Sequence, residues 1–283
     1  MFTQKSGRRR TLVIAPVLAA VALFLLGAGG PAGASSQAGK GPRPTIVLVH
    51  GDWADGSSWT SVIKRLQRKG FTVVAPPNLL RGPVTDTPYL ASYLKSIPGP
   101  IVLVAHSYGG FVATNAATGN DNVKALVYID AFAPDEGETA GELVARGGSC
   151  VGGAFNLVPY DGGVDLYLPW EANPGANPPY PGFIECFANG VVRDEAAVLF
   201  ATQRPAAPAQ FSEPSGPPAW KTIPSWSLIG TQDHVIPLAL QEEMSSRAGA
   251  HITRLKAGHL SLISHPAEVT KVILAAVDAT STS

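Results

Sequence analysis

Three things are scarce in this sequence: cysteine, an excess of charge of one sign, and long uninterrupted apolar runs. Its 21 basic and 21 acidic residues cancel, so the charge balance gives no reason to expect binding to nucleic acid or to an anionic membrane surface. The only thiols are Cys150 and Cys186, and two thiols without a nearby histidine pair make a poor zinc site. We therefore expect no bound metal. The chain also contains no internal repeat.

The first 34 residues have the pattern of an export signal rather than of a folded segment. Lys5 and the run Arg8–Arg10 form a basic start, Leu12–Leu26 an apolar stretch, and Ala32–Ala34 a small-residue cleavage site. The apolar stretch is shorter than the ~20 residues that a membrane-spanning helix needs, although a retained N-terminal anchor is the alternative. We predict a secreted protein without stable membrane association after cleavage. The export route is Sec or, because adjacent arginines precede the apolar stretch, Tat.

Removal of this signal peptide leaves residues 35–283, a length that suits one α/β domain with an insertion. That part carries 17 basic and 21 acidic residues, a net charge of −4. Because an exported chain enters an oxidising compartment, we expect Cys150 and Cys186 to form a disulfide, worth roughly 3–4 kcal/mol in chain entropy. We further expect a monomer that acts on a small molecule.

Apolar runs of strand type alternate with helix-type segments over most of this region. The expected strands cover 45–49, 71–75, 101–105, 123–129, 225–229 and 251–255, and the expected helices cover 57–69, 86–97, 109–117, 238–247 and 266–276. Such alternation predicts a doubly wound, mostly parallel sheet. For the helix over 86–97, Thr85 or Asp86 is the expected N-cap.

The alternation stops from Asp135 to Thr222, a stretch rich in glycine, proline and aromatic residues in which only 193–203 has helical character. A segment of this length inside a regular fold indicates an inserted cap or lid. We therefore divide the chain into a core, residues 35–134 and 223–283, and a cap, residues 135–222, which the disulfide bridges. We expect aromatic residues of the cap to wall an apolar pocket, and loss of the bridge to raise KM more than it lowers kcat.

The stretch 100–110 has the features of a strand, a sharp turn and a helix arranged around one serine. Ile101–Ala105 is a continuous apolar run, and Ser107 lies at the turn that follows it. Because such a turn is strained, the residues two positions before and after its tip must be small, and Ala105 and Gly109 satisfy this. Ser107 is therefore the candidate nucleophile. A serine hydroxyl becomes a nucleophile only when a base removes its proton and an acid orients that base.

The base and the acid are expected in loops after later strands, in the chain order serine, acid, histidine. Of the six histidines, His259 is the candidate base because it lies in the loop after the last expected strand. Asp233 follows the strand 225–229 and is the candidate acid. Asp130, at the end of the preceding strand, is the alternative acid.

Two preorganised N–H donors are needed at the negative oxygen of a tetrahedral intermediate. The backbone N–H of Tyr108, directly after the candidate nucleophile, is expected to be one of them. The other is expected from the loop after Gly51, in the backbone N–H of Asp52, with Trp53 as the alternative. The Asp52 carboxylate must then point away from the developing negative charge.

Four segments, residues 49–59, 104–110, 128–134 and 257–263, together resemble the α/β-hydrolase superfamily. Within it they resemble the branch of small serine esterases that also contains plant methylesterases, hydroxynitrile lyases and bacterial secreted esterases. The resemblance implies a Ser–His–Asp triad under a cap that acts on small esters without a cofactor. Hydroxynitrile lyases of this branch typically have Thr in place of Gly51 and Lys in place of Leu260, so we expect hydrolysis rather than cyanohydrin cleavage.

These patterns predict a secreted serine hydrolase of small-to-medium carboxylic esters that works through an acyl-enzyme intermediate. The same residues would also serve a lactonase, an amidase, a thioesterase or an acyltransferase, and the same scaffold would serve a non-catalytic ligand-binding protein. The resemblance is weakest in the cap, so it does not identify the substrate.

Overall fold

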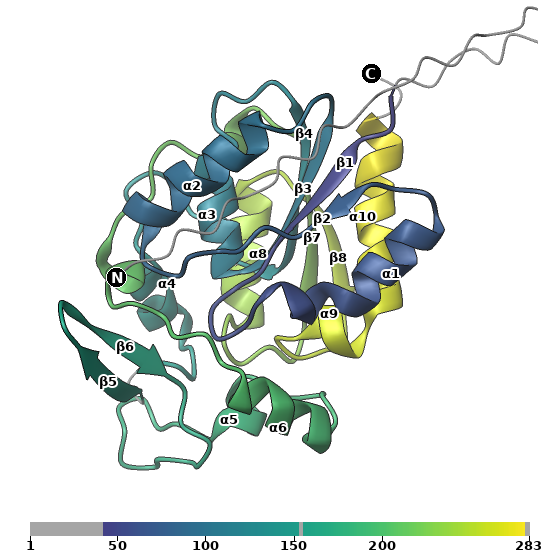
Figure 1. Cartoon of the computed structure of the whole chain (residues 1–283). Coiled ribbons are helices and arrows are strands. Elements are labelled where there is room, and N and C mark those ends of the chain that lie inside the picture. The colour runs from purple at the N-terminus through teal and green to yellow at the C-terminus, as the bar shows by residue number, and fades with distance from the viewer. Residues whose placement is uncertain (1–41, 153–154, 281–283) are drawn as a thin grey trace, which may run out of the picture. The chain divides into compact units, whose positions relative to one another are not determined.

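Six strands form one sheet at the centre of the fold (Figure 1). The computed structural model describes residues 42–152 and 155–280, so the expected signal peptide lies outside the described residues. The strands are β1 (Thr45–Val49), β2 (Val73–Val74), β3 (Ile101–Ser107), β4 (Val123–Ala131), β7 (Ser225–Gly230) and β8 (His251–Leu255). They lie in the order β2-β1-β3-β4-β7-β8, and each neighbouring pair is parallel. The expected parallel sheet is confirmed.

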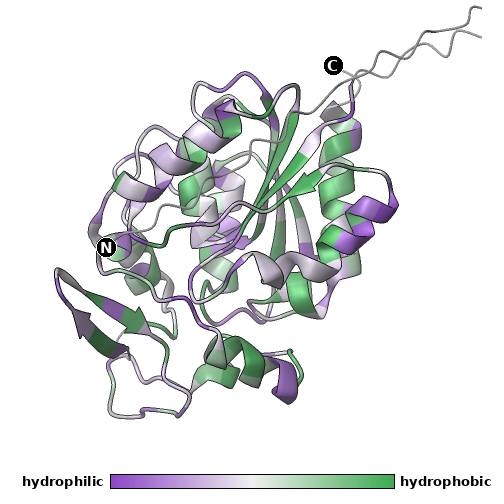
Figure 2. Cartoon of the chain, viewed as in Figure 1, coloured by the Kyte–Doolittle hydropathy of each residue, from purple (hydrophilic) through white to green (hydrophobic). Residues whose placement is uncertain are grey.

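Helices cover both faces of this sheet and bury its central strands (Figure 1). On one face lie α1 (Thr60–Arg68) and α10 (Pro266–Thr280), and on the other α2 (Pro83–Lys95), α3 (Tyr108–Ala116) and α8 (Leu238–Arg247). Every residue of β3 is buried, as is all of β1 except its first residue. Burial on both faces explains why these strands are continuous apolar runs, as Figure 2 shows in green, rather than alternating ones.

The helix α2 begins earlier than its sequence pattern predicts. Its first residue is Pro83 and its N-cap is Gly82, so neither Thr85 nor Asp86 is the cap. Proline suits the first helical position because the N–H that it lacks would have no partner there. Asp86 lies inside the first turn instead, where its carboxylate accepts hydrogen bonds from the backbone N–H groups of Gly82 and Arg81.

Other differences concern the ends of elements. β2 is shorter than the expected strand, and α10 extends four residues further, to Thr280. The segment expected to be one helix from residue 57 opens with a 3-10 turn before α1 begins. The short helical elements of the core are η1 (Gly56–Trp59) and α9 (Ser261–Ser264), and η2 (Ala219–Lys221) lies at the end of the cap.

The cap lies between β4 and β7 and is more regular than its sequence indicates. Its elements are α4 (Ala140–Gly147), β5 (Asn156–Tyr160), β6 (Gly163–Tyr167), α5 (Phe183–Cys186), α6 (Arg193–Ala201) and α7 (Ala209–Ser212), with β5 and β6 paired antiparallel. Helix α4 starts with a capping box between Thr139 and Glu142 and lies outside the one stretch of the cap, 193–203, that was expected to be helical. Cys150 and Cys186 form the expected disulfide.

The cap belongs to the same compact unit as the sheet. Phe183 and Phe187 of the cap are fully buried and join the hydrophobic core that contains the central strands. An ion pair also joins the core to the cap, because Nη1 of Arg81 lies 2.7 Å from Oδ1 of Asp165 in β6. Within the described ranges, no helix is both long and apolar enough to cross a membrane.

A glycine permits the tight turn between β3 and α3. A Cβ atom on Gly109 would lie 2.7 Å from the backbone oxygens of Val49 and His50. Those oxygens belong to the end of a buried strand and cannot withdraw without disturbing the sheet. Helix α3 therefore starts closer to the end of β1 than any side chain would allow.

We predict that Gly109→Ala lowers the free energy of unfolding by about 1–3 kcal/mol, the usual cost of overpacking, even though alanine favours helices more than glycine does. Gly56→Ala is the matched control, because a Cβ atom there would lie 3.5 Å from its nearest neighbours, which is an ordinary contact. Urea denaturation of the two variants measures the difference. Equal stability would contradict the close approach of α3 to β1.

Candidate active site

Ser107 ends β3 in a strained backbone conformation. Its φ is 53° and its ψ is −129°, a combination that residues with a side chain rarely adopt. Strain of this kind persists only where the surrounding structure enforces it, and here a fully buried strand precedes the residue and α3 follows it directly. The Ser107 hydroxyl lies 3.0 Å from Nε2 of His259.

His259 lies in the loop between β8 and α9 and contacts both of the other candidate residues. Its Nε2 faces the Ser107 hydroxyl, and its Nδ1 lies 2.8 Å from Oδ2 of Asp233. Because a carboxylate can only accept, the ring carries its proton on Nδ1, and Nε2 is left to accept from the serine hydroxyl. Burial lowers the pKa of His259 to about 3. The resting ring is therefore neutral, as a general base must be.

Asp233 accepts hydrogen bonds from donors on every side. Its Oδ1 accepts from the backbone N–H groups of Val235 at 2.8 Å and Ile236 at 2.9 Å, and its Oδ2 accepts from Nε2 of Gln241 at 2.9 Å as well as from His259. Burial raises the pKa of Asp233, and the bonds from Ile236, Val235 and Gln241 oppose that rise. The two backbone N–H donors and the Gln241 amide stabilise the ionised carboxylate. Gln241 was not among the expected site residues, because only the packing of α8 brings it to this loop.

Asp130, the alternative acid, contacts the neighbouring loops rather than the imidazole ring. Its Oδ1 accepts from the backbone N–H of Gly230 at 2.8 Å, and its Oδ2 accepts from the backbone N–H and the hydroxyl of Ser261. Gly230 precedes the loop that carries Asp233, and Ser261 follows His259, so Asp130 joins the two loops. Burial raises the pKa of Asp130, and the nearby Asp233 raises it further. The structure thus brings Asp233, and not Asp130, to the histidine.

His106 supports the loop of His259 from the other side. Its Nε2 lies 2.9 Å from the backbone oxygen of His259, to which it donates, and the two ring centroids are 4.7 Å apart. Burial lowers the pKa of His106, so this ring is neutral as well. A residue that directly precedes the strained serine therefore also fixes the backbone of the histidine.

The expected N–H donors lie close to Ser107. A Cβ atom on Gly51 would lie 2.5 Å from the Cβ of Ser107, so the loop that leads to Asp52 packs directly on the serine. Tyr108 is the first residue of α3, a position whose N–H has no partner within the helix. Burial raises the pKa of Asp52, and Asp86 raises it further, which favours a neutral carboxyl that would not oppose a negative oxygen nearby.

Ser107, Asp233 and His259 are all buried. Ser107 is 2% exposed, Asp233 4% and His259 0%. The cap supplies part of this cover, because the ring centroid of Phe187 lies 5.5 Å from that of His259 and 5.8 Å from that of Trp53.

An apolar cavity of about 710 Å³ lies within the cap, and Ser107, Asp233 and His259 are not among its lining residues. Its volume is in the range of ~300–1,000 Å³ that small-molecule sites occupy. Phe155 lines the cavity and stacks on Trp53 with a centroid distance of 5.9 Å. Leu166 lines it too, and its carbonyl accepts from Nε1 of Trp53 at 3.0 Å. The other large apolar lining residues are Val144, Val151, Pro178, Pro208 and Phe211.

The neutral His259 lies beside the Ser107 hydroxyl, and the Asp233 carboxylate orients the histidine. This arrangement equips Ser107 to form a covalent bond to an electrophilic carbonyl carbon or phosphorus atom. In the part of the chain that the structure describes, no group of His, Cys, Asp and Glu side chains is placed to hold a metal ion.

Known proteins resemble the chain in sequence and in fold. A family model described as the alpha/beta hydrolase family matches residues 46–272. A carbendazim-hydrolyzing esterase of Nocardioides sp. is 29% identical over 114 residues, which are 36% of this chain and only 47% of that esterase.

Among solved structures, an extracellular alpha/beta-hydrolase from a Paenibacillus species has a TM-score of 0.63 at 21% identity, with 82% of this chain and 98% of that one covered. Its description reports structural and functional homology to tobacco salicylic acid binding protein 2. A methylesterase from Arabidopsis has a TM-score of 0.66 at 18% identity, with 83% and 99% covered. At these identities the two structures establish the similarity of fold alone.

We predict that a fluorophosphonate, which reacts with activated serine hydroxyls, labels Ser107. Because His259 must take the hydroxyl proton, both Ser107→Ala and His259→Ala should abolish the labelling. Ser227→Ala is the control, since the buried hydroxyl of Ser227 is hydrogen-bonded to Ser245 at 2.9 Å and not to a histidine. Mass spectrometry of the labelled peptides locates the adduct. An adduct on another residue, or one that persists in Ser107→Ala, would show that this site does not activate the serine.

Proposed function

The chain belongs to the alpha/beta hydrolase family, and on that premise we propose that it is a secreted carboxylic-ester hydrolase with a Ser107–His259–Asp233 catalytic triad. The observation that carries the proposal is the pair of hydrogen bonds at His259, one to the Ser107 hydroxyl at 3.0 Å and one to Asp233 at 2.8 Å. Together with the strained backbone of Ser107, this pair has the geometry of nucleophilic catalysis.

Acylation begins when the Ser107 hydroxyl attacks the carbonyl carbon of the ester. His259 takes the hydroxyl proton on Nε2, and Asp233 stabilises the imidazolium that forms. The carbonyl oxygen becomes negative, and the backbone N–H groups of Tyr108 and Asp52 stabilise it. The imidazolium then gives its proton to the departing alcohol, and the acyl group is left on Ser107.

Deacylation repeats these steps with water as the nucleophile. His259 removes a proton from the water as it attacks the acyl-enzyme, and the same N–H groups stabilise the second tetrahedral intermediate. Its collapse releases the carboxylic acid, and the imidazolium returns a proton to Ser107. The cycle therefore consumes one ester and one water, and it gives one acid and one alcohol.

The substrates that the cavity favours are small-to-medium esters with an apolar acyl or aryl group. Its large lining side chains, including Phe155, Phe211 and Leu166, are apolar, and its volume of about 710 Å³ accommodates an aromatic ring with substituents. The names of the Nocardioides esterase and the Arabidopsis methylesterase support ester hydrolysis as the reaction.

Secretion is supported by three observations. First, residues 1–34 have the composition of a signal peptide. Second, the chain contains the Cys150–Cys186 disulfide, a type of bond that persists in oxidising compartments. The Paenibacillus protein of similar fold is described as extracellular.

We predict that Ser107→Ala and His259→Ala each lower kcat for a p-nitrophenyl ester by about 10³-fold or more, because each removes an essential part of one unit. For the same reason the two losses should not add in the double variant. Steady-state kinetics of the three variants tests this. Turnover within about tenfold of the unmodified enzyme in either single variant would rule out this triad.

A second comparison separates the two candidate acids. Asp233→Asn should lower kcat by orders of magnitude, about 10⁴-fold where this substitution has been made in a triad, because an amide cannot accept from all of the donors around it and misorients the imidazole. Asp130→Asn should lower kcat far less, because the amide keeps an oxygen that can accept from the Gly230 N–H, and Asp130 does not touch the ring. The reverse ranking of the two measured kcat values would identify Asp130 as the acid.

A further inference from the structure

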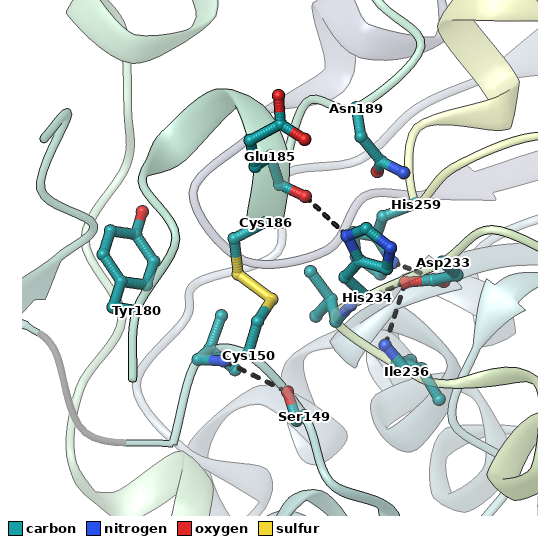
Figure 3. Close-up of a disulfide and its surroundings, with 12 residues drawn as sticks. Ser149, Cys150, Tyr180, Glu185, Cys186, Asn189, Asp233, His234, Ile236 and His259 are labelled. Carbon is teal, nitrogen blue, oxygen red and sulfur yellow. Dashed lines mark hydrogen bonds and ion pairs between the residues drawn. A yellow bond between two sulfur atoms is a disulfide. The ribbon is translucent and has the colours of Figure 1, made fainter. Parts of the chain in front are cut away.

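The loop that carries Asp233 is bound by two separate segments of the cap. From one side, the backbone N–H of Cys150 donates to the carbonyl oxygen of His234 at 2.9 Å. From the other side, the carbonyl oxygen of Glu185 accepts from Nδ1 of His234 at 2.7 Å (Figure 3). His234 follows Asp233 directly in the chain, so one segment binds the backbone and the other the side chain of the residue next to the acid.

Asn189, which follows α5, contacts the loops of both the acid and the base. Its Nδ2 donates to the carbonyl oxygen of Gln232, the residue before Asp233, at 2.6 Å. A Cβ atom on Gly258, the residue before His259, would overlap the side-chain oxygen of Asn189. One amide side chain thus packs between the two residues that precede the base and the acid.

The disulfide connects the two cap segments. Cys150 belongs to the first and Cys186 to the second, and their Cα atoms are 5.8 Å apart. Cys186 lies between Glu185, whose carbonyl binds His234, and Phe187, whose ring packs on His259. Without the bridge, each of the two cap segments would bind the loop of Asp233 independently of the other.

We propose that the Cys150–Cys186 disulfide and Asn189 form a clamp that positions the catalytic acid and base. The proposal rests on the proposed function, because it gives Asp233 and His259 their catalytic roles. Asn189 is a positioning residue, since it acts through the two loops and not on the substrate. The clamp also changes the expectation from sequence, in which the bridge only held the cap over its pocket and its loss mainly raised KM.

Geometry decides which kinetic constant should change. Asn189 contacts residues next to Asp233 and His259 and does not line the apolar cavity, whereas Cys150 lies between the lining residues Ser149 and Val151. A misplacement of about 1 Å between reacting groups costs about 10²-fold in rate. Loosening the clamp at Asn189 should therefore lower kcat and leave KM nearly unchanged.

Asn189→Ala tests the clamp, with Asn173→Ala as its matched control. Asn173 is an asparagine of the same cap whose side chain accepts only from the backbone N–H of Gly175, at 3.1 Å. We expect Asn189→Ala to lower kcat for a p-nitrophenyl ester by about 10- to 100-fold with KM within about threefold, and Asn173→Ala to change neither. The double variant Cys150→Ala/Cys186→Ala should lower kcat at least as much. A rise in KM with unchanged kcat in the clamp variants would overturn the proposal.

A proton resonance tests the clamp independently of ester hydrolysis. The Nδ1 proton of His259, shared with Asp233, should give a downfield ¹H NMR signal in the unmodified protein and lose intensity in Asn189→Ala but not in Asn173→Ala. If the signal behaves in this way but no ester is hydrolysed, the clamp stands and the proposed function fails. If ester is hydrolysed and both the signal and kcat survive in Asn189→Ala, the function stands and the clamp is wrong.

Discussion

The backbone turn at Ser107 is the constraint on which the rest of the site depends. A serine with a φ of 53° costs free energy, and the fold offsets that cost by fixing what lies before and after it. β3 is buried throughout, and Gly51 and Gly109 bring the end of β1 so close that neither position has room for a side chain. The sheet thereby presents one hydroxyl at a fixed point, and the loops that follow β7 and β8 bring the acid and the base to it.

Those two loops depend on contacts from distant parts of the chain. Asp130 joins them from within the sheet through Gly230 and Ser261, His106 binds the backbone of His259, and Asn189 packs between them from the cap. The cap therefore has two roles in this account: it encloses an apolar cavity, and it holds the residues that perform the chemistry. An insertion that seemed to concern only substrate binding is also tied to the triad.

The sequence predicts the sheet and the candidate triad well because local patterns encode them. Strands buried on both faces are continuous apolar runs, and α8 and β8 lie at the expected residues. Ser107 and Asp233 follow such runs, His259 follows the half-exposed edge strand β8, and the structure brings the three residues within hydrogen-bond distance. Gln241 and Asn189 could not be found in this way, because only tertiary packing places them. In the cap, the low regularity of the sequence hid α4 and the β5–β6 hairpin, and at α2 the effect of Pro83 on the helix start was overlooked.

The central claim is that an acyl group is transferred to Ser107, and trapping that intermediate tests it most directly. The enzyme is mixed with an excess of a p-nitrophenyl ester, quenched in acid within the first turnover, digested and examined by mass spectrometry. The account predicts that the peptide containing Ser107 gains the mass of the acyl group, and that the gain is absent in Ser107→Ala. Release of p-nitrophenol at the full rate with no acyl group on that peptide, or with the group on another residue, would contradict it.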